Sequence, residues 1–250
     1  MRYAVISDIH SNLEALEAVL EDIERHHVRN IFCLGDLVGY GGTPREVIDL
    51  AMDFTFCLRG NHDDAVTFKV PSKFNIIAAK AVYWTRELLL PHQHSGPKAR
   101  KRWSFMRSKL KRFVQIQDTI FAHGTPDSYF DYIDNPEVAE ELLDGDEYGV
   151  QTFFVGHTHV GGVFFKDNGK VRFLHSSSPK MPKLGSRKMI INAGSVGQPR
   201  DGDIRACYVL VGDDGFYFRR IPYDVKTAID TVFYINGLPN DSGQRLAEGH

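Results

Sequence analysis

The sequence predicts an α/β protein built on a parallel β-sheet. Three short apolar segments, residues 2–7, 30–35 and 54–58, are typical of buried strands, and segments with apolar residues at helical spacing separate them. The alternation strand–helix–strand–helix–strand implies a parallel sheet with right-handed crossovers. The composition agrees, because 42% hydrophobic and 25% charged residues over 250 positions are typical of a globular protein with a sizeable core.

Two capping signals place the first helices. Ser11-Asn12-Leu13-Glu14 matches a capping box and predicts a helix that runs to about His27. Thr43-Pro44-Arg45-Glu46 repeats the signal, with proline at the first helical position, and predicts a helix to about Met52. The strand at 54–58 is expected to end in a polar turn that carries Asn61 and His62.

Residues 63–112 have a different character and are predicted to be a helical insertion. One helix is expected over 74–90, and a second is expected to end at about Leu110. Since the insertion separates strands that carry candidate site residues, it could roof the site. Basic residues accumulate near its end without an intervening acid, which indicates either a solvated helix face or a patch that steers an anionic substrate: Lys98, Arg100, Lys101, Arg102, Arg107, Lys109, Lys111 and Arg112.

The remainder of the chain is strand-rich. Asp167-Asn168-Gly169 is the strongest hairpin signal, a short acidic helix is expected from Asn135-Pro136, and a closing helix over 225–235 precedes a polar tail. Strands are predicted at 113–117, 119–123, 151–155, 163–165, 171–174, 189–192, 204–211 and 216–221. Because the sequence has neither an internal repeat nor a low-complexity linker, we expect one domain over residues 1–250.

Charge and cysteine content bear on the binding partners and the cellular location that we expect. The formal charge of −2 gives no argument for a nucleic-acid or membrane partner, and no segment approaches the roughly 20 apolar residues of a membrane helix. Asp8 and His10 interrupt the first apolar run, so no signal peptide is expected. Cys33, Cys57 and Cys207 are widely spaced in apolar runs, which predicts reduced core residues and a cytoplasmic protein.

Candidate site residues follow the ends of five strand-like runs. Ligands of such sheets lie beyond the carboxyl ends of the strands, so these residues are expected at one rim. Residues i and i+2 of a strand point the same way, so the pairs Asp8/His10 and His157/His159 could converge if the extended geometry continues. The residues are Asp8, His10, Asp36, Asn61, His62, His123, His157 and His159.

This set predicts a metal site. Aspartate, histidine and asparagine provide oxygen and nitrogen ligands that suit Mn²⁺, iron, Zn²⁺ or Ni²⁺, with Mn²⁺ favoured. Seven candidate ligands exceed what one tetrahedral ion needs and fit two ions that share a carboxylate, an arrangement used for displacement at phosphorus. The other histidines are expected to be structural or surface residues: His26, His27, His92, His94, His175 and His250.

The order of these motifs resembles the calcineurin-like metallophosphoesterases, whose signature runs D-x-H, G-D, G-N-H-[D/E], H and G-H-x-H. Here they span residues 8 to 159, and the stretch 192–200 looks like that of small bacterial phosphodiesterase-type members. The resemblance implies a four-layer α/β/β/α sandwich of two facing mixed sheets flanked by helices. It also implies a first metal on Asp8, His10, Asp36 and His159, a second on Asp36, Asn61, His123 and His157, and His62 beside the leaving group.

One departure from the superfamily bears on the substrate. The family's protein phosphatases read G-D-x-x-D-R-G, where the later Asp supports the catalytic His and the Arg binds phosphate. Here Gly39 and Tyr40 stand at those two positions. This argues against a protein phosphatase and leaves His62 without its usual acidic partner. Tyr40 and Arg200 are therefore candidate substrate contacts, and Asp63 is expected to start the next segment rather than to orient His62.

The sequence thus predicts a metal-dependent phosphodiesterase acting on a nucleotide-like or other small phosphoester. The expected nucleophile is a water that bridges two divalent ions, and His62 would protonate the leaving oxygen. The alternatives are a phosphomonoesterase or nucleotide pyrophosphatase on the same scaffold, or a non-catalytic interaction module like the retromer subunit of this fold, which loss of ligand residues would signal. Only the basic run hints at a nuclease.

Overall fold

The computed structural model describes residues 2–72, 74–91, 96–178, 181–183 and 187–250. His92 and His94 therefore lie outside the described residues. The helices are α1 (Leu13–Arg25), α2 (Pro44–Ala51), α3 (Asn61–Thr67), α4 (Ile76–Leu89), α5 (Pro97–Ser108), α6 (Pro136–Asp144), α7 (Val225–Tyr234) and α8 (Asn240–Glu248). The strands are β1 (Tyr3–Ile6), β2 (Asn30–Cys33), β3 (Phe56–Cys57), β4 (Phe113–Ile116), β5 (Thr119–Ala122), β6 (Thr152–Val155), β7 (Gly162–Asp167), β8 (Lys170–His175), β9 (Met189–Asn192), β10 (Ala206–Val211) and β11 (Phe216–Ile221).

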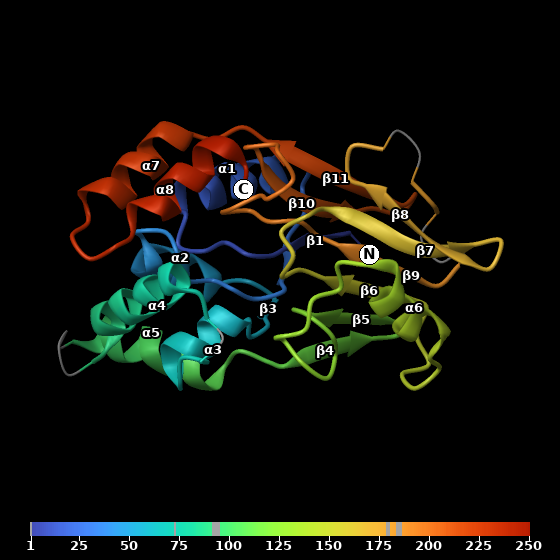
Figure 1. Ribbon diagram of the computed structural model, residues 1–250, viewed down its shortest axis with the longest axis horizontal. Helices are drawn as coiled ribbons and strands as arrows, with labels where there is room; N and C mark the ends of the chain where they lie inside the picture. The colour runs from blue at the N-terminus through green and yellow to red at the C-terminus, as the bar shows by residue number, and fades with distance from the viewer. Residues whose placement is uncertain (1, 73, 92–95, 179–180, 184–186) are drawn as a thin grey trace.

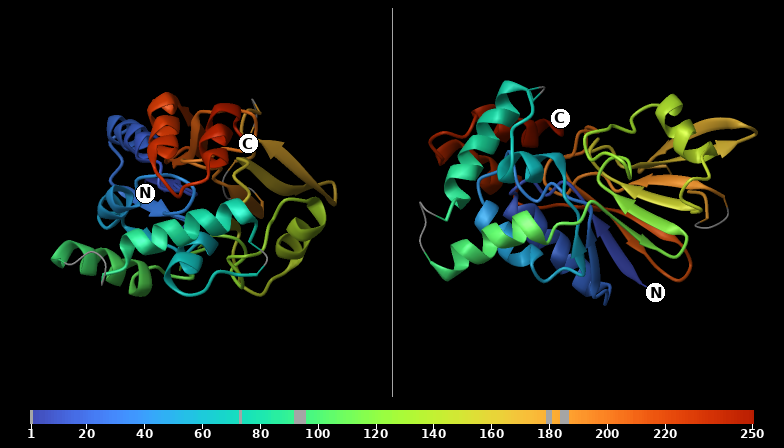
Figure 2. Two further views of the ribbon diagram at one scale, coloured as in Figure 1. Left: turned by 60° about the vertical axis from the view of Figure 1, so that its left-hand side comes forward. Right: turned by 90° about the horizontal axis from the view of Figure 1, so that it is seen from below.

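Two mixed sheets face each other (Figure 1). The first has the order β11-β10-β1-β2-β3, in which β1, β2 and β3 are parallel. The second has the order β4-β5-β6-β9-β7-β8, with a parallel centre of β5, β6 and β9. The right-hand view of Figure 2 shows the blue strands of the first sheet beside the green and yellow strands of the second. The predicted four-layer α/β/β/α sandwich is confirmed.

Period-two alternation of apolar side chains builds the layers. In β1, Ala4 and Ile6 join the cluster shared with α1 and α2, whereas Val5 points into the cluster between the sheets. In β6, Phe154 faces the first sheet, while Phe153 and Val155 join the cluster shared with α6. The central strands of both sheets are therefore buried on two faces, which explains why they read as continuous apolar runs.

Local details differ from the expected caps and ends. The side chain of Asn12, not of Ser11, caps α1 by accepting from Ala15 N at 3.1 Å. Thr43 precedes α2, but its hydroxyl donates to Ser11 O at 2.7 Å instead of closing a capping box. The predicted polar turn at Asn61 and His62 is the first turn of α3.

The predicted polar tail is wrong, because residues 240–248 form α8. Sequence periodicity missed this helix because its buried face consists of Ser242, Gly243 and Leu246, so only one large apolar side chain marks it. Gly243 allows close packing: a Cβ there would lie 2.9 Å from Phe233 of α7.

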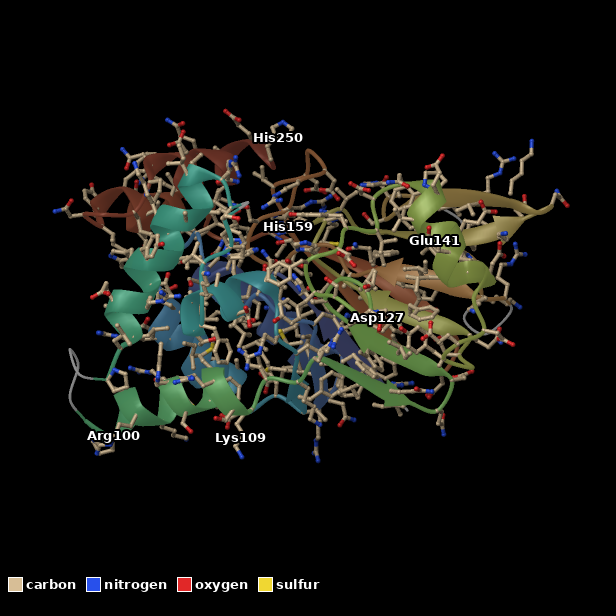
Figure 3. The ribbon with its side chains drawn as sticks, turned by 60° about the horizontal axis from the view of Figure 1, so that its bottom comes forward. Arg100, Lys109, Asp127, Glu141, His159 and His250 are labelled. Atoms are coloured by element: carbon tan, nitrogen blue, oxygen red, sulfur yellow. The ribbon has the colours of Figure 1, made fainter. Side chains whose placement is uncertain are left out.

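The cysteines and the basic run can be placed directly. Cys33, Cys57 and Cys207 are buried free thiols, as predicted. Among the eight basic residues of 98–112, Arg102 binds Asp49 on α2, and the others are exposed. Figure 3 shows Arg100 and Lys109 at the outer surface, away from His159. No described helix has the length and apolar character needed to cross a membrane.

Candidate metal centre

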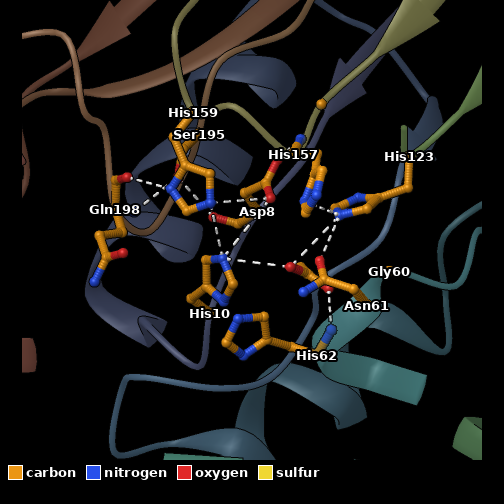
Figure 4. Close-up of polar contacts among 12 residues, drawn as sticks. Asp8, His10, Gly60, Asn61, His62, His123, His157, His159, Ser195 and Gln198 are labelled. Atoms are coloured by element: carbon orange, nitrogen blue, oxygen red, sulfur yellow. Dashed lines mark hydrogen bonds and ion pairs between the residues drawn. The ribbon is translucent and has the colours of Figure 1, made fainter. Parts of the chain in front are cut away.

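Five loops at one rim bring the predicted site residues together (Figure 4). They follow the carboxyl ends of three strands of the first sheet and two of the second, so the site lies where the two sheets meet. Every predicted candidate ligand is buried at this point. Asp8 and His10 follow β1, Asp36 follows β2, Asn61 follows β3, His123 follows β5, and His157 and His159 follow β6.

The side chains do not converge in the way that the spacing suggested. Continued extended geometry was expected to align i and i+2, but φ is 54° at Asp8, 49° at His10 and 52° at Asp36. His157 and His159 have φ of 67° and 62°. Left-handed conformations are uncommon for residues other than glycine and cluster at functional sites. The chain thus turns sharply after β1, β2 and β6, and these turns direct the side chains into the rim.

The first group of ligand atoms contains one carboxylate and two imidazoles. Nε2 of His10 and Nε2 of His159 are 3.1 Å apart, and Oδ1 of Asp8 lies 3.2 Å from Nε2 of His159. Oδ2 of Asp36 is 3.6 Å from Nε2 of His10, so the carboxylate of Asp36 closes this group.

The second group shares Asp36. Its Oδ2 is 3.5 Å from Nε2 of His123. That same imidazole nitrogen lies 3.2 Å from Oδ1 of Asn61 and 3.2 Å from Nδ1 of His157. One oxygen of Asp36 therefore faces both groups, as expected for a shared carboxylate.

Backbone carbonyls orient the imidazoles. Nδ1 of His159 is 2.6 Å from Gln198 O, and Nδ1 of His10 is 3.2 Å from Val38 O. A carbonyl only accepts, so both Nδ1 atoms carry the proton and both Nε2 atoms present lone pairs. Two lone pairs 3.1 Å apart, beside a buried Asp8 Oδ1 that has no hydrogen-bond donor among the described residues, repel each other unless a cation lies between them. The donor set therefore fits a metal ion.

The second group is oriented in the same manner. Nε2 of His157 lies 3.3 Å from Phe130 O, which leaves the lone pair of Nδ1 for the shared space. The carboxylates are fixed as well. His62 N donates to Asp36 Oδ1 at 2.8 Å, and His157 N donates to Asp8 Oδ2 at 3.0 Å.

Two buried carboxylates dominate the electrostatics. Burial alone would raise the pKa of Asp8 and of Asp36, but His159 beside the former and His123 beside the latter lower each pKa below its usual range. Burial disfavours the charged form of His123, yet Asp36 and Asp8 raise its pKa to about 9. Burial, with the charge of His123, lowers the pKa of His157 to about 3. The two buried carboxylates thus favour positive charge between them.

His62 lies at the edge of the cluster with its ring between aromatic side chains. Its centroid is 4.6 Å from that of Tyr40, 5.1 Å from that of Phe74 and 4.9 Å from that of His10. Burial lowers its pKa most, Asp36 opposes this and Arg200 adds to it, and the result is about 4. His62 is consequently neutral at pH 7 in the protein alone.

No acidic side chain supports His62 in the described part of the chain, and its Nδ1 has no hydrogen-bond partner there. A Cβ at Gly39 would lie 2.4 Å from this nitrogen, so the backbone of Gly39 fills the space beside it. Asp63 faces elsewhere: Oδ2 accepts from Gly60 N at 3.0 Å and Oδ1 accepts from Val38 N at 3.3 Å. Asp63 thus fixes the start of α3, as predicted.

Tyr40 and Arg200 lie next to each other beside the cluster. The guanidinium carbon of Arg200 is 5.8 Å from the centroid of the Tyr40 ring, and Nη2 donates to Gln198 Oε1 at 2.9 Å. Nε of Arg200 is buried without a hydrogen-bond partner among the described residues. The Tyr40 ring is 5% exposed, because His10 and His62 pack against it.

Several contributors could not be identified from residue types alone. Val38, Phe130 and Gln198 orient histidines through backbone carbonyls, which no side-chain pattern reveals. Tyr132 stacks on His157 with ring centroids 3.8 Å apart. Ser195 donates to Asp8 O at 2.8 Å, and the distinctive stretch 192–200 was the sequence signal for that contact.

Comparisons with known proteins agree with this geometry. Residues 1–161 match the model of the calcineurin-like phosphoesterase family. An uncharacterized protein of Methanocaldococcus jannaschii is 36% identical, with 98% of this chain and 97% of that protein covered. A metallophosphoesterase from Sphaerobacter thermophilus is 34% identical with a TM-score of 0.83, covering 100% of this chain and 99% of that one.

A hypothetical protein of Pyrococcus horikoshii shares the fold, with a TM-score of 0.76 at 19% identity over 100% of this chain and 98% of that chain. The family match covers the segment that carries all of the candidate ligands, from Asp8 to His159. The chain belongs to the calcineurin-like phosphoesterase family.

Proposed function

We propose that the protein is a metal-dependent phosphodiesterase that hydrolyses a nucleotide-like or other small phosphoester. The observation that supports this most strongly is the pair of Nε2 lone pairs of His10 and His159, 3.1 Å apart and beside the orphaned carboxylate oxygen of Asp8. The first ion would be held by these three residues and Asp36. The second would be held by Asp36, Asn61, His123 and His157.

The nitrogen and oxygen donors suit Mn²⁺, iron, Zn²⁺ and Ni²⁺, and we take Mn²⁺ as the favoured ion. A pair of divalent ions supplies Lewis-acid polarisation of the phosphoryl group and lowers the pKa of water. The polypeptide fixes the ligand positions, because backbone groups orient three of the histidines and both carboxylates. The free thiols fit the reducing cytoplasm.

His62 is the proposed proton donor to the leaving oxygen. Its ring is held by packing against Tyr40 and Phe74 instead of by a carboxylate. Burial, with the charge of Arg200, makes the neutral imidazole its resting form, and the negative charge of a bound phosphoester would raise its pKa. The helical insertion 63–112 contributes Phe74 to this pocket. This contact supports the proposal that the insertion covers the site and forms one domain with the rest of residues 1–250.

The preference for diesters rests on two positions. Gly39 and Tyr40 stand where related protein phosphatases have an Asp and a phosphate-binding Arg. A side chain at Gly39 would collide with His62, and Tyr40 does not supply the positive charge of an arginine. A monoester dianion gains more from an arginine than a diester does. Arg200 favours phosphomonoesterase activity as the second candidate, because its buried Nε has no partner among the described residues and can donate a hydrogen bond to a phosphate oxygen.

The test compares 4-nitrophenyl phosphodiesters with 4-nitrophenyl phosphate on Mn²⁺-loaded protein. The proposal predicts a higher kcat/KM for the diesters. A preference for the monoester that Arg200→Ala abolishes would support the second candidate, and loss of turnover on metal removal is required by both.

A further inference from the structure

The mouth of the candidate site has an aromatic side chain that the metal chemistry does not require. Tyr132 lies in the loop between β5 and α6, and its ring stacks on His157 with centroids 3.8 Å apart and an interplanar angle of 25°. It is nevertheless 47% exposed. A ring that covers a candidate ligand on one face and keeps half of its surface open can receive a second planar group.

The loop that carries Tyr132 is anchored on both sides. Thr125 N donates to Ser128 O at 2.9 Å, and Ser128 N donates to Thr125 O at 3.2 Å. Tyr148 OH donates to Asp127 Oδ2 at 2.6 Å, and Ile133 is buried among the residues that α6 covers. Tyr132 is therefore held in place before any ligand arrives, so stacking on it costs little conformational entropy.

Two other aromatic residues beside the site, Tyr40 and Phe74, are less suited to this role. The ring of Tyr40 is 5% exposed and is occupied by His10 and His62. Phe74 packs against His62, on the flank where the leaving group is proposed to lie. Tyr132 instead contacts His157, a member of the second ligand group together with His123.

The charge around Tyr132 suits a phosphoester. Arg200 supplies a cation beside the cluster, where its guanidinium carbon lies 5.8 Å from the centroid of Tyr40 and its buried Nε has no hydrogen-bond partner among the described residues. A phosphoester bound at the site would bring its second substituent within reach of the open face of Tyr132, because that ring stacks on the candidate ligand His157. An aromatic substituent there combines stacking with the existing charge, whereas an alkyl group gains only contact area.

We propose that Tyr132 is a specificity-determining residue that stacks on the non-leaving substituent of the diester, and that this substituent is a planar aromatic group. A phenyl ring and a nucleobase share this chemistry. The inference rests on the proposed phosphodiesterase activity and names the substrate class within it.

The experiment uses three 4-nitrophenyl phosphodiesters with the same leaving group and a different second substituent: phenyl, thymidine 5′-yl or ethyl. Stacking of a base on an aromatic side chain predicts a kcat/KM roughly 10-fold higher for an aromatic ester than for the ethyl ester. Tyr132→Phe should keep this ratio. Tyr132→Leu should bring it close to one, because it should slow the aromatic esters more than the ethyl ester. Tyr217→Leu, a change at an exposed tyrosine of β11, is the matched control and should alter nothing.

Direct binding provides a second measurement. Calorimetry should show tighter binding of phenylphosphonate than of ethylphosphonate, and Tyr132→Leu should abolish the difference. A wild-type ratio near one in both assays would overturn the inference, as would a Tyr132→Leu variant that loses metal and slows all three esters equally. A preference for only the phenyl or only the thymidine ester would identify which aromatic group fits. If no diester is hydrolysed but the phosphonate difference persists, the proposed function fails while the stacking site stands.

Discussion

Replacement of His62 tests whether this residue is a proton donor or a metal ligand. Atoms of His10, Asp36 and His62 lie within 4.8 Å of one another, so His62 could in principle hold an ion. His62→Ala removes the ring but keeps the backbone N–H that donates to Asp36 Oδ1 at 2.8 Å, so the shared carboxylate stays oriented. We therefore expect metal content near that of the wild type.

Turnover should fall by about 10²–10⁴-fold, the usual contribution of a general acid. The loss should be smaller for 4-nitrophenyl esters than for alkyl esters, because nitrophenolate leaves without protonation. The ring is 4% exposed and packs on Tyr40 and Phe74, so the cavity should also lower the free energy of unfolding by about 2–4 kcal/mol.

His62→Phe is the matched control for the cavity. Phenylalanine fills the space without a titratable group, so it should recover much of the melting temperature and none of the rate. Metal analysis and steady-state kinetics on the two variants decide the matter. If both variants lose metal in proportion to activity, His62 is a ligand and the assignment of a proton donor is wrong.

Three further changes test other parts of the structure. Asp36→Ala should reduce binding of both ions, measured by metal analysis, because one oxygen of Asp36 lies within 3.6 Å of imidazoles in both groups; loss of a single ion would contradict its shared position. Tyr40→Arg should improve kcat/KM for the monoester relative to the diester, since it adds a cation beside Arg200, and an unchanged ratio would argue against the charge explanation. Asp22→Asn should lower the free energy of unfolding at pH 7 by about 1–3 kcal/mol, the usual range for hydrogen bonds to a charged group, because it disrupts the contacts of Asp22 with Arg219. Burial raises the pKa of Asp22, but hydrogen bonds, that of Arg219 first, lower it overall. In denaturant titrations, the difference in free energy of unfolding between the wild type and Asp22→Asn should therefore be full at neutral pH and shrink below about pH 4.

The sequence predicted the sheet and its rim because both depend on short-range patterns. Apolar runs such as Phe153–Val155 are buried on both faces, and each ends at a polar residue where the strand ends. The order of the ligand motifs, together with the family resemblance, indicated the metal centre. All seven candidate ligands meet in space, which the sequence could only infer from topology.

The remaining features depend on tertiary contacts. Left-handed turns at Asp8 and His157 replace the expected extended geometry, and no periodicity encodes them. The Gly39 backbone lies close to the ring of His62, at the side where the acidic partner is missing, and this approach becomes visible only when the two loops are packed together. Tyr132 lies in a loop with no motif, so its position against His157 had no sequence signal.

Metal stoichiometry measured together with activity tests the central claim most directly. The protein should contain close to two divalent ions per chain when loaded with Mn²⁺, as a paired site requires. Removal of the ions by a chelator should abolish hydrolysis of 4-nitrophenyl phosphodiesters, and added Mn²⁺ should restore it in step with reoccupation of the site. Full activity in a chelator-treated sample shown by elemental analysis to be metal-free would contradict the account.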